Sequence, residues 1–182
     1  MKHLAVFIFT CIILIPSAGA QNLLTKNGKI SFFSKTPLEN IDAVNNQTVS
    51  ILNSKTGEMA FSVLITGFLF KKAQMQEHFN ENYLESTKYP KATFSGKISD
   101  MSKVNFTRDG TYAVTVNGNL TVHGVTNKVT APGTLTVKGK NITASSVFNI
   151  LLADYKISIP KLVENNISKS IDIKVDCKYS PQ

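Results

Sequence analysis

Two histidines and one cysteine are the reactive side chains of most interest after residue 20, and they lie far apart. His78 and His123 fall in different predicted elements, and neither has a second histidine or a cysteine at a ligand spacing. This arrangement does not match a zinc site, which needs three or four such ligands. The expected role of His78, which follows Glu77, is a solvated side chain; His123 is expected to be solvated or to hydrogen-bond within a turn. We therefore predict no metal and no cofactor.

The sequence also lacks the motifs of common enzyme classes. It contains no Gly-x-Ser-x-Gly elbow, no phosphate-binding loop and no dinucleotide fingerprint. No two carboxylates have a spacing that alone would make them an acid/base couple. Cys177 falls on the apolar face of a predicted strand, where a thiol acts as a small inert hydrophobic group. The sequence thus predicts a protein that is not an enzyme.

The first twenty residues have the pattern of a secretory signal peptide. Lys2 provides a positive charge, an apolar run follows over residues 4–15, and Ala18-Gly19-Ala20 is a small-x-small cleavage site. The run is shorter than the about 20 residues that a membrane-spanning helix needs. We expect cleavage of residues 1–20, a periplasmic or secreted protein, and a single domain over residues 21–182. With Cys11 removed, an internal disulfide is excluded.

The charge of the chain is positive but dispersed. Lysine and arginine number 20 against 12 acidic residues, and Arg108 is the only arginine. Sequence-specific nucleic-acid binding uses clustered arginines and stacking aromatics, so we expect no nucleic-acid partner. The scattered lysines suit solubility and a weak contact with anionic membrane surfaces. The sequence leaves open whether two copies form a homodimer.

Alternation of apolar and polar residues with a period of two is the dominant pattern. It is clearest over residues 112–124 and 171–179. Such alternation predicts strands with one buried face. Weaker versions recur, including one in which Val49 and Ile51 are the apolar positions. Eight strands are predicted in all, at residues 29–34, 47–53, 59–65, 92–98, 112–124, 129–137, 142–152 and 171–179.

Short links with turn residues join most of these strands. We expect turns at Thr56-Gly57, at Asp109-Gly110, over residues 124–127 and at Gly139-Lys140. Short links make successive strands antiparallel, and eight such strands favour an all-β barrel or a sandwich.

One segment has a helical period instead. Met75, Phe79 and Tyr83 recur every four residues within 71–86, which predicts an amphipathic helix between the third and fourth strands. Tyr89-Pro90 ends this helix, because proline disfavours helical geometry in the residue before it. Residues 153–169 are expected to form a long loop, with room for a short helix.

Small residues on the predicted inward face raise the question of a cavity. An eight-stranded barrel is just wide enough to be filled by side chains or to hold one slim ligand. Glycine inside a strand often marks a close approach of a ligand or of another backbone. The alternative is that these small residues form bulges or face large partners such as Phe94 and Phe148. The small residues are Gly96, Gly118, Ala131, Gly133, Ala144 and Ser146.

Several segments resemble the YceI-like family. Residues 61–98 contain a Met-x-x-His-Phe helix followed by Tyr-Pro-x-Ala-x-Phe, and residues 118–129 read GNLTVHGVTNKV. The opening GKISFFSKTPLENIDA and the closing IDIKVDCKY are also similar. The resemblance implies an eight-stranded, lipocalin-like antiparallel barrel, usually periplasmic, that binds polyisoprenoids or other long-chain lipids in a tunnel.

The resemblance and the strand alternation together give a set of candidate ligand-contacting residues. Met75, Phe79 and Tyr83 are expected near the barrel mouth. The full set is Phe32, Phe61, Val63, Met75, Phe79, Tyr83, Phe94, Tyr112, Val114, Val116, Leu120, Ala131, Leu135, Ala144, Phe148 and Ile173.

The leading functional hypothesis is an exported binding protein that sequesters or carries a long-chain amphiphile, such as a polyisoprenoid, an isoprenoid quinone or a fatty-acid-like lipid. Burial of each CH₂ contributes about 0.8 kcal/mol, so an apolar bore can hold such a chain without any catalytic group. Two alternatives remain: a structural or interaction barrel filled by its own side chains, and an enzyme acting on a lipid head group with His78 or His123.

Overall fold

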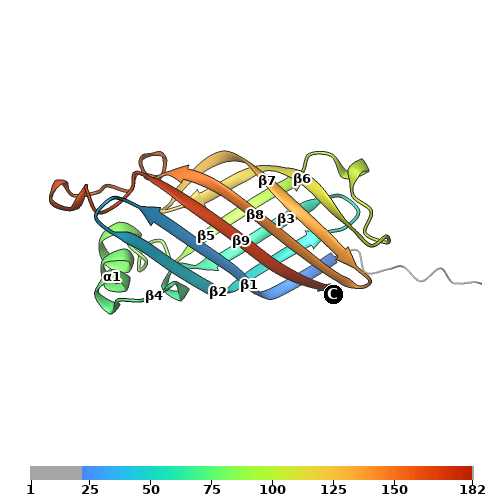
Figure 1. The fold of residues 1–182 in the computed structure, drawn as a ribbon, viewed down its shortest axis with the longest axis horizontal. Helices are drawn as coiled ribbons and strands as arrows, with labels where there is room; N and C mark the ends of the chain where they lie inside the picture. The colour runs from blue at the N-terminus through green and yellow to red at the C-terminus, as the bar shows by residue number, and fades with distance from the viewer. Residues whose placement is uncertain (1–21, 182) are drawn as a thin grey trace, which may run out of the picture.

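Eight antiparallel strands curl into a closed barrel in the computed structural model, which describes residues 22–181. Neighbours follow the order β1-β9-β8-β7-β6-β5-β3-β2, and pairing of β1 with β2 closes the ring (Figure 1). A short extra strand, β4 (Leu69–Phe70), pairs with β2 beyond the end of β3. The barrel strands are β1 (Asn22–Lys35), β2 (Asn40–Asn53), β3 (Glu58–Leu64), β5 (Lys91–Ile98), β6 (Gly110–Val122), β7 (Val125–Lys138), β8 (Asn141–Leu151) and β9 (Ser170–Pro181).

The predicted amphipathic helix lies between β4 and β5. The α-helix α1 (Ala73–His78) runs directly into a π-helical turn, η2 (Phe79–Tyr83); we call the two together the mouth helix. Short 3₁₀ turns are η1 (Ile65–Gly67), η3 (Met101–Lys103), η4 (Leu152–Tyr155) and η5 (Lys161–Val163); η5 lies within the expected long loop, and η4 begins one residue before it. Within residues 22–181 no helix combines the length and the apolar character needed to span a membrane.

Two of the predicted turns differ from the structure. β6 and β7 are joined by His123 and Gly124, both at positive φ (50° and 72°), as a tight hairpin turn requires, so β7 already begins at Val125. The turn expected over 124–127 is therefore wrong in its bounds: the observed one starts one residue earlier and ends three residues earlier. Asp109-Gly110 is not a tight hairpin, because β5 ends at Ile98 and a longer link containing η3 precedes β6. The Asp109 carboxylate instead accepts a hydrogen bond from the backbone N–H of Gly139, at 2.7 Å.

β2 is longer than predicted, and its buried face has the opposite phase. Val49 and Ile51 point outward, each 40% exposed, whereas Thr48 and Ser50 are buried inside the barrel. Inside the barrel the Ser50 and Tyr179 hydroxyls lie 2.7 Å apart, whereas the buried Thr48 hydroxyl has no hydrogen-bond partner among the described residues. The register between β1 and β2 also shifts around Gly28, which bends both strands.

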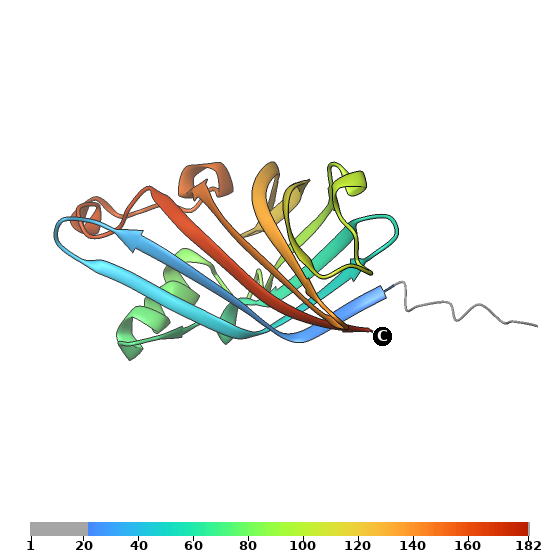
Figure 2. The ribbon, with the colours of Figure 1, turned by 45° about the vertical axis from the view of Figure 1, so that its right-hand side comes forward.

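The barrel end far from α1 is packed solid. There the link between β5 and β6 folds over the opening (Figure 2) and packs Met101, Val104 and Phe106 against a buried cluster. Burial raises the pKa of the Cys177 thiol to about 11, as expected for an inert core cysteine. The closed-end core consists of Leu23, Leu52, Met59, Ile98, Leu135, Val137, Ile142, Cys177 and Tyr179.

Candidate ligand cavity

The half of the barrel next to α1 contains a largely apolar cavity of about 500 Å³. This volume falls within the about 300–1,000 Å³ of typical small-molecule sites. Its outer walls come from the mouth helix, from the hairpin between β1 and β2, and from the loop that contains η5. We call this end the mouth.

Most of the residues predicted to contact a ligand lie around this cavity, and four do not. Tyr112, Val114, Leu135 and Ala144 belong to or pack against the closed-end core, because the inward stripes of β6, β7 and β8 continue past the end of the cavity. The tunnel is therefore shorter than the alternation in the sequence indicates. The lining includes Phe32, Phe61, Val63, Met75, Phe79, Tyr83, Phe94, Val116, Leu120, Ala131, Phe148 and Ile173.

Phe94 forms the floor of the cavity and explains two of the small residues. A Cβ atom placed on Gly96 or on Gly118 would lie 2.4 Å from the Cζ atom of the Phe94 ring. These two glycines thus make room for a side chain rather than for a ligand, as the alternative interpretation proposed. Phe94 packs against the closed-end core on one side and the cavity on the other, with the Phe61 ring edge-on at 6.0 Å. Ala131 and Ser146, in contrast, do line the cavity.

Four phenylalanines attach the mouth helix to the barrel. The Phe79 ring lies 5.4 Å from Phe32, 5.6 Å from Phe68 and 5.0 Å from Phe70, measured between centroids. Phe68 and Phe70 were not predicted, because they lie in the irregular segment around η1 and β4, where no period of two exists. The one sequence feature that could have indicated these two residues is the close spacing of the phenylalanines in the Phe-Leu-Phe run. Desolvation here raises the pKa of Tyr83.

The charged and amide side chains that line the cavity gather at its mouth. Glu39 accepts a charge-assisted hydrogen bond from Lys72 at 2.9 Å, which lowers the pKa of that carboxyl group, and Asn166 donates to it as well. Gln74 and His78 also border the opening. The sequence predicted His78 as a solvated side chain and did not predict its position at the rim. The arrangement offers charged and amide groups to a polar head and carbon surfaces to an attached chain.

Comparison with known proteins places the chain in a family. A model described as the YceI-like domain matches residues 23–179. The chain belongs to the YceI-like family. No curated protein gives a match by sequence.

Solved structures show the same barrel as this YceI-like chain. A polyisoprenoid-binding domain from Saccharophagus degradans has a TM-score of 0.77 at 16% identity, covering 90% of this chain and 99% of that one. BcnA from Burkholderia cenocepacia has a TM-score of 0.70 at 18% identity, covering 84% and 96%. The Campylobacter jejuni YceI protein has a TM-score of 0.58 at 14% identity, covering 100% and 99%. The predicted eight-stranded, lipocalin-like antiparallel fold is thus confirmed.

His123 of this YceI-like domain lies outside the cavity but close to the mouth helix. Its side chain is only 11% exposed, so of the two expected roles the solvated one is wrong; the side chain does hydrogen-bond, but to other loops and not within its own turn. Its imidazole lies 2.7 Å from the Glu85 carboxylate and 3.1 Å from the Tyr155 carbonyl oxygen. The Tyr89 ring covers it edge-on at 4.7 Å. Sequence spacing could not reveal this cluster, because it joins three separate loops.

Metal ligation has no visible basis in the part of the chain that the structure describes. Over residues 22–181 no three His, Cys, Asp or Glu side chains come together in a way that would hold an ion. His78 and His123 lie on different elements, and Cys177 is buried in the closed-end core.

Proposed function

We propose that this protein binds one long-chain amphiphile, with the apolar chain inside the barrel and the head group at the mouth. The observation that carries the proposal is the asymmetry of the cavity: its walls and floor are apolar apart from Thr93 and Ser146, whereas charged and amide groups line its open end. Each CH₂ that leaves water contributes about 0.8 kcal/mol, so a ten-carbon tail gains roughly 8 kcal/mol before ordering costs. Binding needs no reacting group, so the proposal is for a non-catalytic protein.

A polyisoprenoid is the first ligand class to test, with isoprenoid quinones and fatty-acid-like lipids next. Support comes from membership of the YceI-like family and from the polyisoprenoid-binding domain of Saccharophagus degradans, which has the same fold. Aromatic rings lie at both ends of the cavity, with Phe94 at the floor and Phe32 and Phe79 near the mouth. These rings offer broad contact surfaces to a branched, unsaturated chain.

The mouth indicates how a head group would be held. Lys72 is hydrogen-bonded to Glu39 but largely exposed, and an ammonium group has three donors, so Lys72 can also donate to an anionic head group while it keeps its bond to Glu39. Gln74 and Asn166 add amide donors beside it. An anionic head, such as a phosphate or a carboxylate, therefore suits this rim best.

The proposed function also includes export of the protein. Residues 1–20 have the pattern of a signal peptide, although they lie outside the described residues. We place the protein in the periplasm or outside the cell, where it would carry its lipid between membranes or hold it in reserve.

The direct test is mass spectrometry of organic extracts from gently purified native protein. We expect about one amphiphile per chain in the wild type. Ala131→Phe projects a ring into the cavity and should empty it, whereas Thr130→Phe, whose side chain lies outside on the same strand, should retain the ligand. If repeated preparations from the native host contain no stoichiometric amphiphile, the barrel is not a lipid carrier.

A further inference from the structure

We propose that the mouth docks on an anionic lipid bilayer through two exposed leucines, Leu38 and Leu162. The inference deepens the proposed function, on which it rests, because a lipid ligand must leave a bilayer to enter the cavity. Leu38 lies at the tip of the hairpin between β1 and β2 and is 69% exposed. Leu162 lies in η5 and is 95% exposed.

The two leucines project from loops that are fixed to each other. The backbone N–H of Ser168, in the loop after η5, donates to the Ser34 hydroxyl near the end of β1 at 2.9 Å. Asn166, also in the loop after η5, and Glu39 on the hairpin both line the mouth of the cavity. The hairpin is itself tightened by hydrogen bonds between Thr36 and Glu39 of 2.9–3.1 Å. Little ordering entropy is thus lost when these tips enter a membrane interface.

The leucines also adjoin the opening of the cavity. Val163, next to Leu162, lines the cavity, as do Glu39, next to Leu38, and Ile167 farther along the same loop. A surface that covers the two leucines therefore covers the mouth. A chain could then pass from bilayer to barrel without crossing water.

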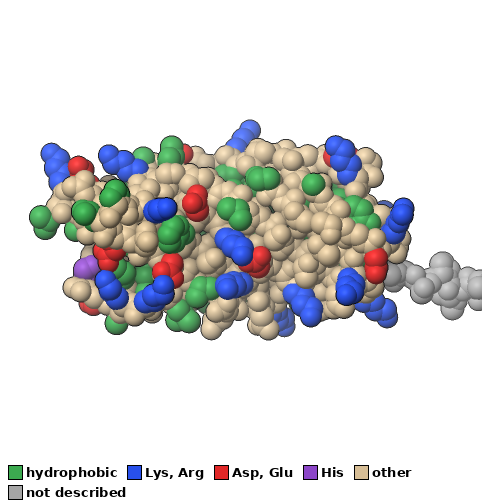
Figure 3. All heavy atoms as spheres, in the orientation of Figure 1, with side chains coloured by type: hydrophobic (Ala, Val, Ile, Leu, Met, Phe, Trp, Pro, Cys, Tyr) green, Lys and Arg blue, Asp and Glu red, His purple; other side chains and the backbone are tan. Residues whose placement is uncertain are grey.

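Charge around the leucines favours an anionic lipid surface. Lys35 and Lys161 lie within three residues of the two leucines and form no ion pair among the described residues, and together they outnumber Glu164, which is also unpaired two residues after Leu162. The hairpin's acidic groups, in contrast, are neutralised: Glu39 by Lys72 and Asp42 by Lys71, each at 2.9 Å. Leucines that enter the acyl boundary beside lysines at head-group level are the pattern of interfacial membrane binders. Figure 3 shows apolar and basic side chains exposed near each other at this end.

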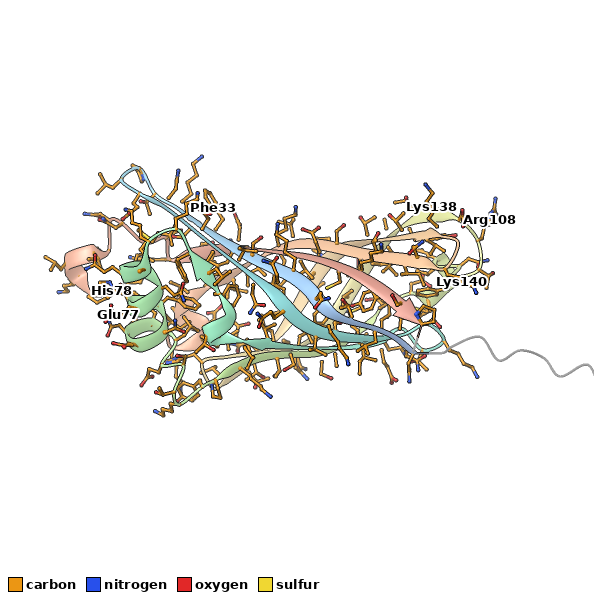
Figure 4. All side chains as sticks on the ribbon, turned by 90° about the horizontal axis from the view of Figure 1, so that it is seen from below. Phe33, Glu77, His78, Arg108, Lys138 and Lys140 are labelled. Carbon is orange, nitrogen blue, oxygen red and sulfur yellow. The ribbon has the colours of Figure 1, made fainter. Side chains whose placement is uncertain are left out.

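The closed end is the competing docking site. Arg108, Lys138 and Lys140 lie there, opposite Glu77 and His78 on α1 (Figure 4). These charges would attract an anionic membrane at long range, but no strongly exposed leucine within residues 22–181 accompanies them. Insertion is therefore assigned to the mouth, and the experiment has to distinguish the two ends.

The chain contains no tryptophan, so a single introduced one reports on its own site. Leu162→Trp and Lys140→Trp are each mixed with phosphatidylcholine vesicles containing phosphatidylglycerol. We expect a blue shift and quenching by brominated lipids at residue 162 and neither at residue 140. Leu38→Asp/Leu162→Asp should weaken vesicle binding in flotation at least tenfold, whereas Val147→Asp, at a residue 56% exposed on the barrel wall, should leave it unchanged.

Three fluorescence outcomes overturn the docking inference. A shift at residue 140 alone assigns docking to the basic end, and no shift at either residue excludes insertion. A blue shift at residue 162 that grows with protein concentration in the absence of vesicles assigns the leucines to contact between two copies. The amphiphile content of organic extracts is measured separately. Extracts that contain the amphiphile, from a protein that does not insert into vesicles, contradict only the docking. Insertion by a protein whose extracts contain no amphiphile contradicts only the carrier function.

Discussion

The Nε2 atom of His123 lies 2.7 Å from Oε2 of Glu85, a contact that joins the turn between β6 and β7 to the segment just after the mouth helix. Both residues have a left-handed backbone, with φ of 50° for His123 and 43° for Glu85. Neither is glycine, so each conformation costs energy that surrounding contacts have to offset. Leu84, beside Glu85, lines the cavity, so the contact fixes one wall of the ligand site.

The first prediction concerns the energy of this contact. His123→Ala removes the hydrogen bonds to Glu85 and Tyr155, and we expect it to lower the free energy of unfolding by about 1–3 kcal/mol. Glu85→Ala should cost less, because Glu85 is 44% exposed. Urea denaturation of both single variants and of the double variant measures the coupling, expected at about 0.5–2 kcal/mol. If the loss of unfolding free energy in the double variant equals the sum of the losses in the two single variants, the two side chains do not stabilise each other.

The second prediction concerns the floor of the cavity. Phe94→Ala removes the ring that covers Gly96 and Gly118, so the cavity should extend toward the closed end. We expect a loss of about 3–5 kcal/mol in stability from the lost packing, partly recovered when a ligand fills the space. Thermal unfolding with amphiphiles of increasing chain length measures this: the longest chain that stabilises the protein should be longer for the variant than for the wild type.

Gly96→Ala is the matched control for this variant. Its added methyl group would meet both the Phe94 ring and the carbonyl oxygen of Asn117, at 2.6 Å. It should therefore destabilise the barrel without lengthening the preferred chain. The same chain-length limit in Phe94→Ala and in the wild type would show that Phe94 is not the floor.

The sequence predicted the strands well because their alternation reflects burial on one face. β6 and β9 alternate without interruption, and the helix was predicted from Met75, Phe79 and Tyr83. β2 was predicted in the wrong phase because the polar residues Thr48 and Ser50 occupy the inside, where the Ser50 hydroxyl pairs with that of Tyr179 on the distant strand β9. No local pattern reveals such partners.

The extent of the cavity was not predictable for a related reason. Small inward residues look alike in the sequence, yet Gly96 and Gly118 lie beneath the Phe94 ring while Ala131 and Ser146 face open space. The difference depends on the direction in which a single aromatic side chain points. Likewise, the tips with Leu38 and Leu162 come together only because the loop after η5 is hydrogen-bonded to the end of β1.

The third prediction concerns alkaline pH. Burial raises the pKa of Cys177 to about 11, from 9.0, and also raises the pKa of Tyr179. Between the pKa of the unfolded chain and the higher pKa of the folded chain, the buried group keeps a proton that the unfolded chain has lost. The stabilisation by the buried neutral group is therefore complete below pH 9 and is lost as pH rises through the pKa of the folded state. For Cys177 the contribution is on the order of 3 kcal/mol.

Urea denaturation at pH 8, 9, 10 and 11 measures this dependence. The wild type should lose stability steeply above pH 9, and Cys177→Ala should show a shallower decline despite a lower starting stability. Iodoacetamide should not modify the native thiol at pH 8. Equal slopes for the two proteins would show that Cys177 does not contribute to the pH dependence.

The last prediction concerns opening of the mouth. Phe79 connects the mouth helix to the barrel through its contacts with Phe32, Phe68 and Phe70. In Phe79→Ala the helix keeps its backbone hydrogen bonds but loses these rings, so it should open more often. Hydrogen exchange within residues 73–83 should accelerate at least tenfold, and bound amphiphile should leave faster. Phe106→Ala, which removes a comparable ring from the closed end, should speed exchange within residues 99–109 and leave ligand release unchanged. Faster release in both variants would indicate that general destabilisation, and not opening of the mouth helix, controls ligand exit.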